Sequence, residues 1–190
     1  MRMFKRARGL TILVALAIVL AVPELQSAAS HSSAGPPSGR VAVAAELVVV
    51  DGLASARLNP VRAARVLGYV SVGMARAASD HPSSELAVAA AAARVIAGML
   101  STQADAADAL VAETRGDLLA RGVGQRRLEA AEQRGARIGG RLLDRAARDG
   151  ADSVQASPAP QFPGAWQPTP PGFLPPVEPA AGSWRTWHLR

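Results

Sequence analysis

The sequence has no cysteine, a single lysine and few aromatic residues. Without cysteine, the 190-residue chain forms no disulfide and offers no thiolate nucleophile or cysteine ligand for a metal. The only lysine is Lys5, so the positive charge of the remaining chain comes from arginine. Aromatic residues amount to 4% and are concentrated after residue 160. The core of the alanine-rich body is therefore predicted to be thin.

The first 30 residues have the pattern of a secretory signal peptide. Four basic residues lie within 1–8, an apolar stretch covers 10–22, and small residues stand at 27–30. We predict cleavage near Ala29 and an exported protein. An uncleaved anchor helix is the alternative, but the apolar stretch is shorter than the roughly 20 residues that a membrane-spanning helix needs.

The net charge of +6 does not describe the body of the chain. Residues 1–30 contain four of the 21 basic and one of the 15 acidic residues, so the remainder has a net charge of +3. Arginines alternate with acidic residues along this remainder, whereas a nucleic-acid-binding surface needs clustered basic residues. The pattern predicts no nucleic-acid binding, and contact with a membrane only during export.

Hydrophobic periodicity predicts an all-α fold of four to five alanine-rich helices that follows a flexible leader over 31–40. The helical region covers 41–150, and no strand pair or tandem repeat stands out in it. Asn59 and Pro60 are typical of a helix start, and Thr102 begins a capping pattern. The expected helices cover 41–57, 60–78, 84–101, 102–121 and 125–148.

Three of these helices have a stripe of small or apolar residues that we predict to be buried. In the helix from Pro60 the stripe is Val61, Ala64, Leu67, Gly68, Ser71, Met74, Ala75 and Ala78. In the helix from Thr102 it is Ala106, Ala107, Leu110, Val111, Leu118 and Leu119. In the last helix it is Leu128, Ala131, Gly135, Ile138, Leu142 and Ala146. The glycines at 135, 139 and 140 are expected either to permit close helix contact or to bend this helix.

Residues 151–190 differ from the body because they combine proline with large aromatic side chains. All three tryptophans stand here, at 166, 184 and 187. Seven prolines between 163 and 179 exclude helix and central strand. A merely flexible linker is poor in aromatic residues. This tail is therefore predicted to be an extended segment whose rings insert into a surface.

The tail resembles a segment of one protein family. The residues that carry the resemblance are Trp166-Gln167-Pro168-Thr169-Pro170-Pro171-Gly172-Phe173, then Pro176-Val177-Glu178-Pro179 and Trp184. They are similar to the connection between the N-terminal helical region and the catalytic region of bacterial vanadium-dependent haloperoxidase-like proteins. These proteins belong to the type 2 phosphatidic acid phosphatase (PAP2) superfamily. A weaker similarity in order and spacing extends over residues 41–190.

The resemblance implies the front part of such a protein without its catalytic region. Complete members hold phosphate or vanadate with a lysine, arginines, a Ser-Gly-His segment and a later histidine, because the oxyanion needs fixed positive donors and an apical nitrogen. Here the one lysine is Lys5, and there is no Arg-Pro pair and no Ser-Gly-His. We predict no catalytic, cofactor-binding or metal-binding residue and no cofactor in this chain. Vanadate is the cofactor of complete members with haloperoxidase activity.

The three histidines have simple structural explanations. His31 belongs to the leader, His81 to a turn between helices, and His188 to the end of the sequence. No histidine pair or acidic cluster has the spacing of a metal site.

The acidic residues of the last helices are also expected to be structural. Asp105 with Asp108, and Glu129 with Glu132, are predicted to be solvated charges beside arginines rather than catalytic carboxylate pairs. The arginine-rich last helix is compatible with contact to anionic lipid, but its acidic residues favour a solvent-facing surface.

Two readings of function remain open. In the first, the chain is an exported, truncated haloperoxidase- or acid-phosphatase-like protein that comprises only the helical N-terminal region. Its residues 151–190 then connect to a catalytic region that is lost or separately encoded. In the second, it is a stand-alone secreted helical binding module whose Trp/Pro-rich tail recruits a partner. In neither reading is the chain an enzyme as given.

Overall fold

The computed structural model describes residues 37–153, 162–164 and 167–187. These residues form five α-helices and two short 3-10 helices, with no strand among them, so the all-α prediction is confirmed. The predicted signal peptide and its cleavage site lie outside the described residues. The elements are α2 (Pro37–Ser55), α3 (Pro60–Ala77), α4 (Ser84–Met99), η1 (Ser101–Gln103), α5 (Ala104–Ala120), α6 (Gln125–Ala146) and η2 (Ala181–Ser183).

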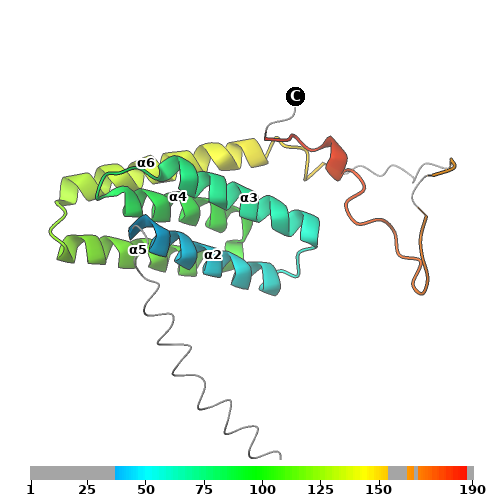
Figure 1. Cartoon of the computed structure of the whole chain (residues 1–190), viewed down its shortest axis with the longest axis horizontal. Helices are drawn as coiled ribbons and strands as arrows, with labels where there is room; N and C mark the ends of the chain where they lie inside the picture. The colour runs from blue at the N-terminus through cyan, green and yellow to red at the C-terminus, as the bar shows by residue number, and fades with distance from the viewer. Residues whose placement is uncertain (1–36, 154–161, 165–166, 188–190) are drawn as a thin grey trace, which may run out of the picture. The chain divides into compact units, whose positions relative to one another are not determined.

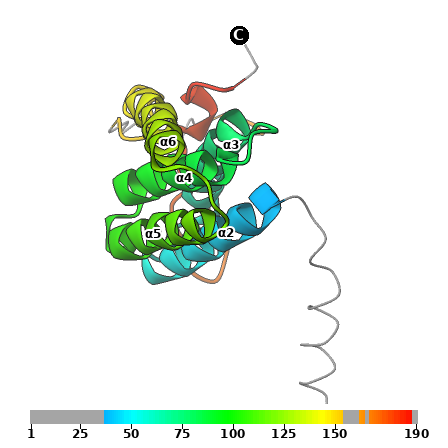
Figure 2. The ribbon, with the colours of Figure 1, turned by 90° about the vertical axis from the view of Figure 1, so that its left-hand side faces the viewer.

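α4 lies at the centre of the helical bundle. Figures 1 and 2 show α3 and α6 on one side of it and α2 and α5 on the other. Every residue from Ser83 to Ala93 is buried. The run of alanines at 89–93 makes this possible, because small side chains allow helices on several sides to approach at close packing density.

Two glycines bring α6 close to α4. A Cβ atom at Gly135 would collide with the carbonyl oxygen of Ala87. At Gly139 a Cβ atom would lie 2.8 Å from the carbonyl oxygen of Ala91. Gly140 has open space within 4 Å instead. Close helix contact, one of the two roles expected for these glycines, is therefore confirmed at positions 135 and 139.

The predicted buried stripes are right for the last helix and wrong for the helix from Pro60. All six residues of the stripe in α6 are buried. In α3 only Met74 of the eight predicted residues is fully buried. Small residues occur on both sides of α3, so periodicity alone does not select the side that carries Tyr69. The buried face of α3 consists of Val66, Tyr69, Val70, Gly73, Met74 and Ala77.

The start of α5 differs from the predicted capping pattern. Thr102 lies in η1, and Gln103 occupies the N-cap position without a side-chain capping bond. Gln103 is buried, and its Nε2 donates to Oδ2 of Asp51 in α2 at 3.1 Å. The stripe of α5 is also narrower than predicted, because Ala106 and Leu119 are exposed.

α2 begins earlier than predicted. Residues 37–40, assigned from sequence to a flexible leader, form its first turn. Proline is well accommodated there, because its φ already suits a helix and the first helical amide needs no partner. α2 ends at Ser55, before the expected end at Arg57, whose φ is 48°. None of the described helices is long and apolar enough to cross a membrane.

Candidate functional site

The first turns of α3 direct two arginines toward the C-terminal tail. Asn59 caps the helix: its Oδ1 accepts the amide of Arg62 at 3.0 Å, and Pro60 follows, which confirms the predicted start. With the start fixed, Arg62, Arg65 and Tyr69 fall on one side of α3 at spacings of three and four residues. This side contacts the residues that follow α6.

Asp149, just after α6, is the buried centre of this arrangement. Arg65 donates to both carboxylate oxygens, from Nε at 2.8 Å and from Nη2 at 3.2 Å, and the hydroxyl of Tyr69 donates to Oδ2 at 2.9 Å. The amide of Ala151 donates to Oδ1 at 2.9 Å. Burial acts to raise the pKa of Asp149, but these donors outweigh burial and hold the pKa below its usual range. Burial, followed by the hydrogen bond to Asp149, raises the pKa of Tyr69 to about 12.

Glu178 in the tail is bound by the first turn of α3. Arg62 donates to it from Nε and, at 3.2 Å, from Nη2, and Nδ2 of Asn59 donates at 2.9 Å. The hydrogen bond from Arg62, and then that from Asn59, lowers the pKa of Glu178. Glu178 has a φ of 51°, a conformation that is costly for a residue other than glycine. The three hydrogen bonds offset that cost.

Two tryptophans pack the end of the tail against α3 and α6. The ring of Trp187 meets that of Tyr69 edge-on, with centroids 4.9 Å apart and an angle of 62°. The guanidinium of Arg145 lies 4.4 Å from the centre of the Trp187 ring. Trp184 and Trp187 are both half-buried. The predicted insertion of tail rings into a surface is confirmed for Trp187, and that surface belongs to this chain; the guanidinium of Arg62 lies 5.8 Å from the centre of the Trp184 ring. The prediction is wrong for Phe162 and Phe173, which are exposed. Trp166 lies outside the described residues.

Backbone hydrogen bonds fix the same part of the tail. The amide of Arg185 donates to the carbonyl oxygen of Asp149 at 2.7 Å. Nη2 of Arg145 donates to the carbonyl oxygen of Thr186 at 2.6 Å. We name this set of contacts the tail clasp. It consists of Asn59, Arg62, Arg65, Tyr69, Arg145, Asp149, Glu178, Arg185, Thr186 and Trp187.

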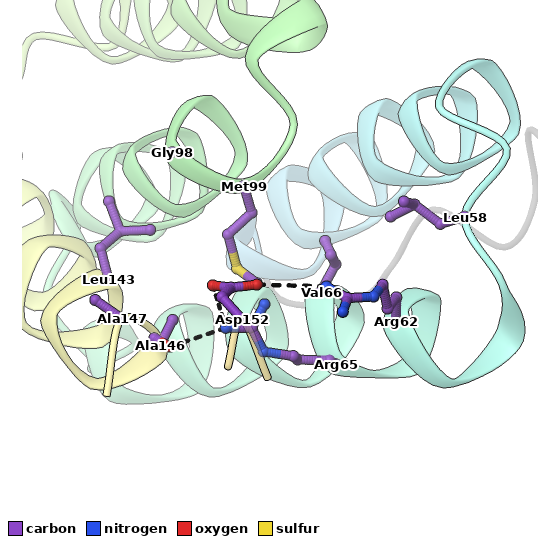
Figure 3. Close-up of a pocket in the computed structure, with 10 residues that line it drawn as sticks. All are labelled: Leu58, Arg62, Arg65, Val66, Gly98, Met99, Leu143, Ala146, Ala147 and Asp152. Carbon is purple, nitrogen blue, oxygen red and sulfur yellow. Dashed lines mark hydrogen bonds and ion pairs between the residues drawn. The ribbon is translucent and has the colours of Figure 1, made fainter. Parts of the chain in front are cut away.

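A cavity of about 340 Å³ lies beside the tail clasp. Its volume is within the range of small-ligand pockets. Figure 3 shows the carboxylate of Asp152 between Arg62 and Arg65. Oδ1 lies 3.3 Å from Nη1 of Arg62, and Oδ2 lies 3.7 Å from Nη2 of Arg65. The lining residues are Leu58, Arg62, Arg65, Val66, Gly98, Met99, Leu143, Ala146, Ala147 and Asp152.

The arginines at this cavity are already paired with carboxylates. Two guanidinium groups, those of Arg62 and Arg65, face the three carboxylates of Asp149, Asp152 and Glu178. A phosphate or vanadate would have to displace a carboxylate from these arginines. Among the described residues, no group of three or more His, Asp or Glu is placed to hold a metal ion. The arrangement is suited to holding the tail in place.

The histidines considered from the sequence lie apart from the tail clasp. His81 is exposed in the turn before α4, with Nδ1 2.9 Å from Oγ of Ser83. This is the inter-helix turn expected for it. His31 and His188 lie outside the described residues.

The acidic pairs also lie elsewhere. Asp105 and Asp108 are exposed on α5. Glu129 accepts a hydrogen bond from Nε2 of Gln125 at 3.0 Å, and Glu132 forms an ion pair with Arg115 of α5. The structure therefore gives each acid of the last pair its own partner, and neither pair converges on a shared site.

Sequence reasoning does not identify the residues of the tail clasp. The buried stripe predicted for the helix from Pro60 omits Arg62 and Arg65, and the last predicted helix ends one residue before Asp149. One signal is present in the sequence. Glu178 is the only acidic residue after Asp152, which indicates a specific cationic partner for it.

The chain was compared with known proteins in three ways. A scan against protein-family models, a search of curated proteins and a search of solved structures each found no match. The resemblance carried by residues 166–184 therefore remains a prediction from the sequence.

Proposed function

We propose that this chain is a helical docking module that presents a proline-rich loop to a partner. The loop covers 162–177, between the end of α6 and Glu178. The observation that carries the proposal is that the chain is held on both sides of this loop, while large apolar side chains in its described part, 162–164 and 167–177, are exposed. Phe173, Leu174 and Val177 are 63%, 73% and 63% exposed.

The two attachments differ in their partners but both involve α3. Before the loop, Asp149 and Asp152 bind Arg65 and Arg62. After the loop, Glu178 binds Arg62 and Trp187 packs on Tyr69. A segment fixed at both ends loses less conformational entropy on binding than a free tail does. This supports a role in presenting apolar side chains to another surface.

The partner that the resemblance suggests is a catalytic region of the haloperoxidase or acid phosphatase type, in an exported protein. Pro176-Val177-Glu178-Pro179, which carries part of the resemblance, forms the boundary between the exposed loop and the tail clasp. On this proposal the helical bundle contributes no catalytic group. It holds one end of the connecting segment and leaves the other part open to the catalytic region.

A stand-alone binding module is the second candidate. The observation that favours it is that Trp187 already packs on Tyr69 of α3 and Arg145 of α6, so the tail is anchored without a further domain. In this case the loop binds a separately folded protein, and its prolines limit the entropy lost on binding.

The DNA that follows the codon of Arg190, and the genes beside it, distinguish the two candidates. Coding sequence for the lysine, Arg-Pro and Ser-Gly-His motifs, in any frame, is expected from the first candidate. The encoded polypeptide is then expressed separately and titrated against this chain by calorimetry. Absence of those motifs contradicts the first candidate and leaves the second.

The titration has a matched pair of variants. Phe173→Asp is expected to weaken binding by about tenfold or more, because an aromatic anchor at the centre of an interface is lost. Leu119→Asp removes another exposed apolar residue, on α5, and is expected to leave binding unchanged. Equal effects of the two substitutions would contradict docking through the loop. Phosphatase or halide-oxidising turnover by the purified chain would contradict the proposal altogether.

A further inference from the structure

The exposed side of α6 carries a line of arginines. Positions 126, 130, 133, 137, 141 and 144 recur every three or four residues, so they follow one side of the helix, and position 148 lies in the turn directly after it. Arginine occupies four of these positions, and Arg127 lies beside the line. All five of these arginines are exposed. We name them the arginine stripe: Arg126, Arg127, Arg137, Arg141 and Arg148.

The acidic residues of α6 offset the arginine stripe only in part. Glu132 pairs with Arg115 of α5, and Glu129 accepts a hydrogen bond from Gln125. Asp144 is the single acid that shares the line. In the part of the chain that the structure describes, no ion pair joins an arginine of the stripe to a carboxylate. The stripe and its line thus carry five arginines and one acid, which is a local excess of positive charge.

We propose that the arginine stripe is a docking surface for a membrane that contains anionic phospholipids. The part of the stripe that lies within α6, from Arg126 to Arg141, extends about 22 Å at 1.5 Å per residue. Figures 1 and 2 show α6 along an outer edge of the bundle. Guanidinium groups bind phosphate oxygens in a paired geometry. A row of them matches a surface of phosphodiester headgroups, and binding is electrostatic, without insertion of apolar side chains.

Two features of the sequence favour a lipid surface over nucleic acid. The apolar stretch at 10–22 has the pattern of a signal peptide, and a signal or an anchor there would bring the chain to a membrane. The stripe also has no aromatic side chain to stack on bases, and Gln133 is the only amide side chain on its line. This proposal concerns α6 alone and does not depend on the tail clasp or on the proposed function.

The test is sedimentation of the full chain with vesicles of equal parts phosphatidylglycerol and phosphatidylcholine, compared with vesicles of phosphatidylcholine alone. We expect tighter binding to the anionic vesicles at low salt, and loss of that difference in high salt, because salt screens exposed charges. Residues 1–30 contribute equally to every variant, so the ratio between variants reports the arginine stripe.

Two matched pairs of variants separate the stripe from net charge. Arg137→Gln is expected to weaken binding to anionic vesicles about fivefold, as for one arginine near a charged surface, whereas Arg57→Gln after α2 has little effect. Asp144→Asn is expected to strengthen binding by a similar factor, whereas Asp108→Asn on α5 does not. All four residues are exposed, so each variant is expected to fold.

Two outcomes would overturn the proposal. Equal changes within each matched pair would mean that only net charge matters. Tighter binding to duplex DNA than to anionic vesicles at the same salt concentration, lost in Arg137→Gln, would assign the stripe to nucleic acid instead.

Discussion

α6 takes part in two contacts that differ in their chemistry. Toward α4 it offers Gly135 and Gly139, and the contact depends on the absence of side chains there. Toward the tail it offers Arg145 and the following Asp149, and the contact depends on long charged side chains and aromatic rings. The first contact is apolar and backbone-to-backbone; the second is mainly polar.

The difference determines what it costs to open each contact. Separating α6 from α4 exposes fully buried side chains such as Leu128 and Leu142, whose burial stabilises the fold by about 25 cal/mol per Å² of apolar surface. Opening the tail clasp hydrates its charged groups, which compensates for much of the lost attraction. We therefore expect the bundle to open only by global unfolding and the tail to detach separately at lower cost.

The largest expected effect comes from filling the α4–α6 contact. Gly135→Ala places a methyl group against the carbonyl oxygen of Ala87, where neither backbone can yield without separating the helices. We expect a loss of about 3 kcal/mol or more in the free energy of unfolding, measured with urea. Gly140→Ala, on the same helix but in open space, is the control. It is expected to stabilise by up to about 1 kcal/mol through helix propensity. Similar losses in both variants would contradict a tight contact at Gly135.

The next largest effect is expected at the buried carboxylate of the tail clasp. Asp149→Ala leaves Arg65 and Tyr69 without their shared acceptor and is expected to cost about 3 kcal/mol. Asp152→Ala removes a carboxylate whose side chain is 68% exposed and is expected to cost less than about 1 kcal/mol. Equal losses of unfolding free energy for the two variants, measured with urea, would show that burial does not determine how much Asp149 contributes to stability.

A smaller effect is expected from the aromatic part of the clasp. Trp187→Ala removes the edge-on contact with Tyr69 and the surface under Arg145, at a cost of about 2 kcal/mol. We expect the loss mainly as faster amide hydrogen exchange in the tail, and we expect the urea midpoint of the bundle to change little. Phe173→Ala, in the exposed loop, is the control and is expected to change neither quantity.

The smallest effect concerns charge and pH. Glu178→Gln keeps the size of the side chain but removes its charge, and is expected to weaken tail protection by less than about 1 kcal/mol. The pKa values of Asp149 and Glu178 are both lowered in the folded chain. Their contribution is therefore fully present above about pH 5 and is lost as the pH falls below about 4. If the tail amides became better protected from hydrogen exchange on acidification, the predicted direction of the pH effect would be contradicted.

The sequence predicts the helical bundle better than it predicts the site. The buried stripe predicted for the last helix is correct because its large residues Leu128, Ile138 and Leu142 all lie on the same side. The stripe of α3 fails because alanine, serine and glycine populate both sides, so the side that carries Tyr69 is selected by tertiary packing. Helix starts are clear where a cap forms, as at Asn59, and unclear where a tertiary contact replaces it, as at Gln103.

The tail clasp is beyond sequence reasoning because its partners are far apart in the chain. Arg62 and Glu178 are separated by 116 residues, and Arg65 and Asp149 by 84. No local pattern links them. The prolines and tryptophans predict a segment that lies on a surface, and they do not show that this surface is α3 and α6 of the same chain.

The central claim is that the chain holds the end of its own tail while leaving the loop before it open. Amide hydrogen exchange measured residue by residue by NMR tests it most directly. The amide of Arg185, which donates to the carbonyl oxygen of Asp149, is expected to exchange slowly. The amides of Leu174 and Val177, in the exposed loop, are expected to exchange fast. Equally fast exchange at Arg185 and in the loop would contradict the account.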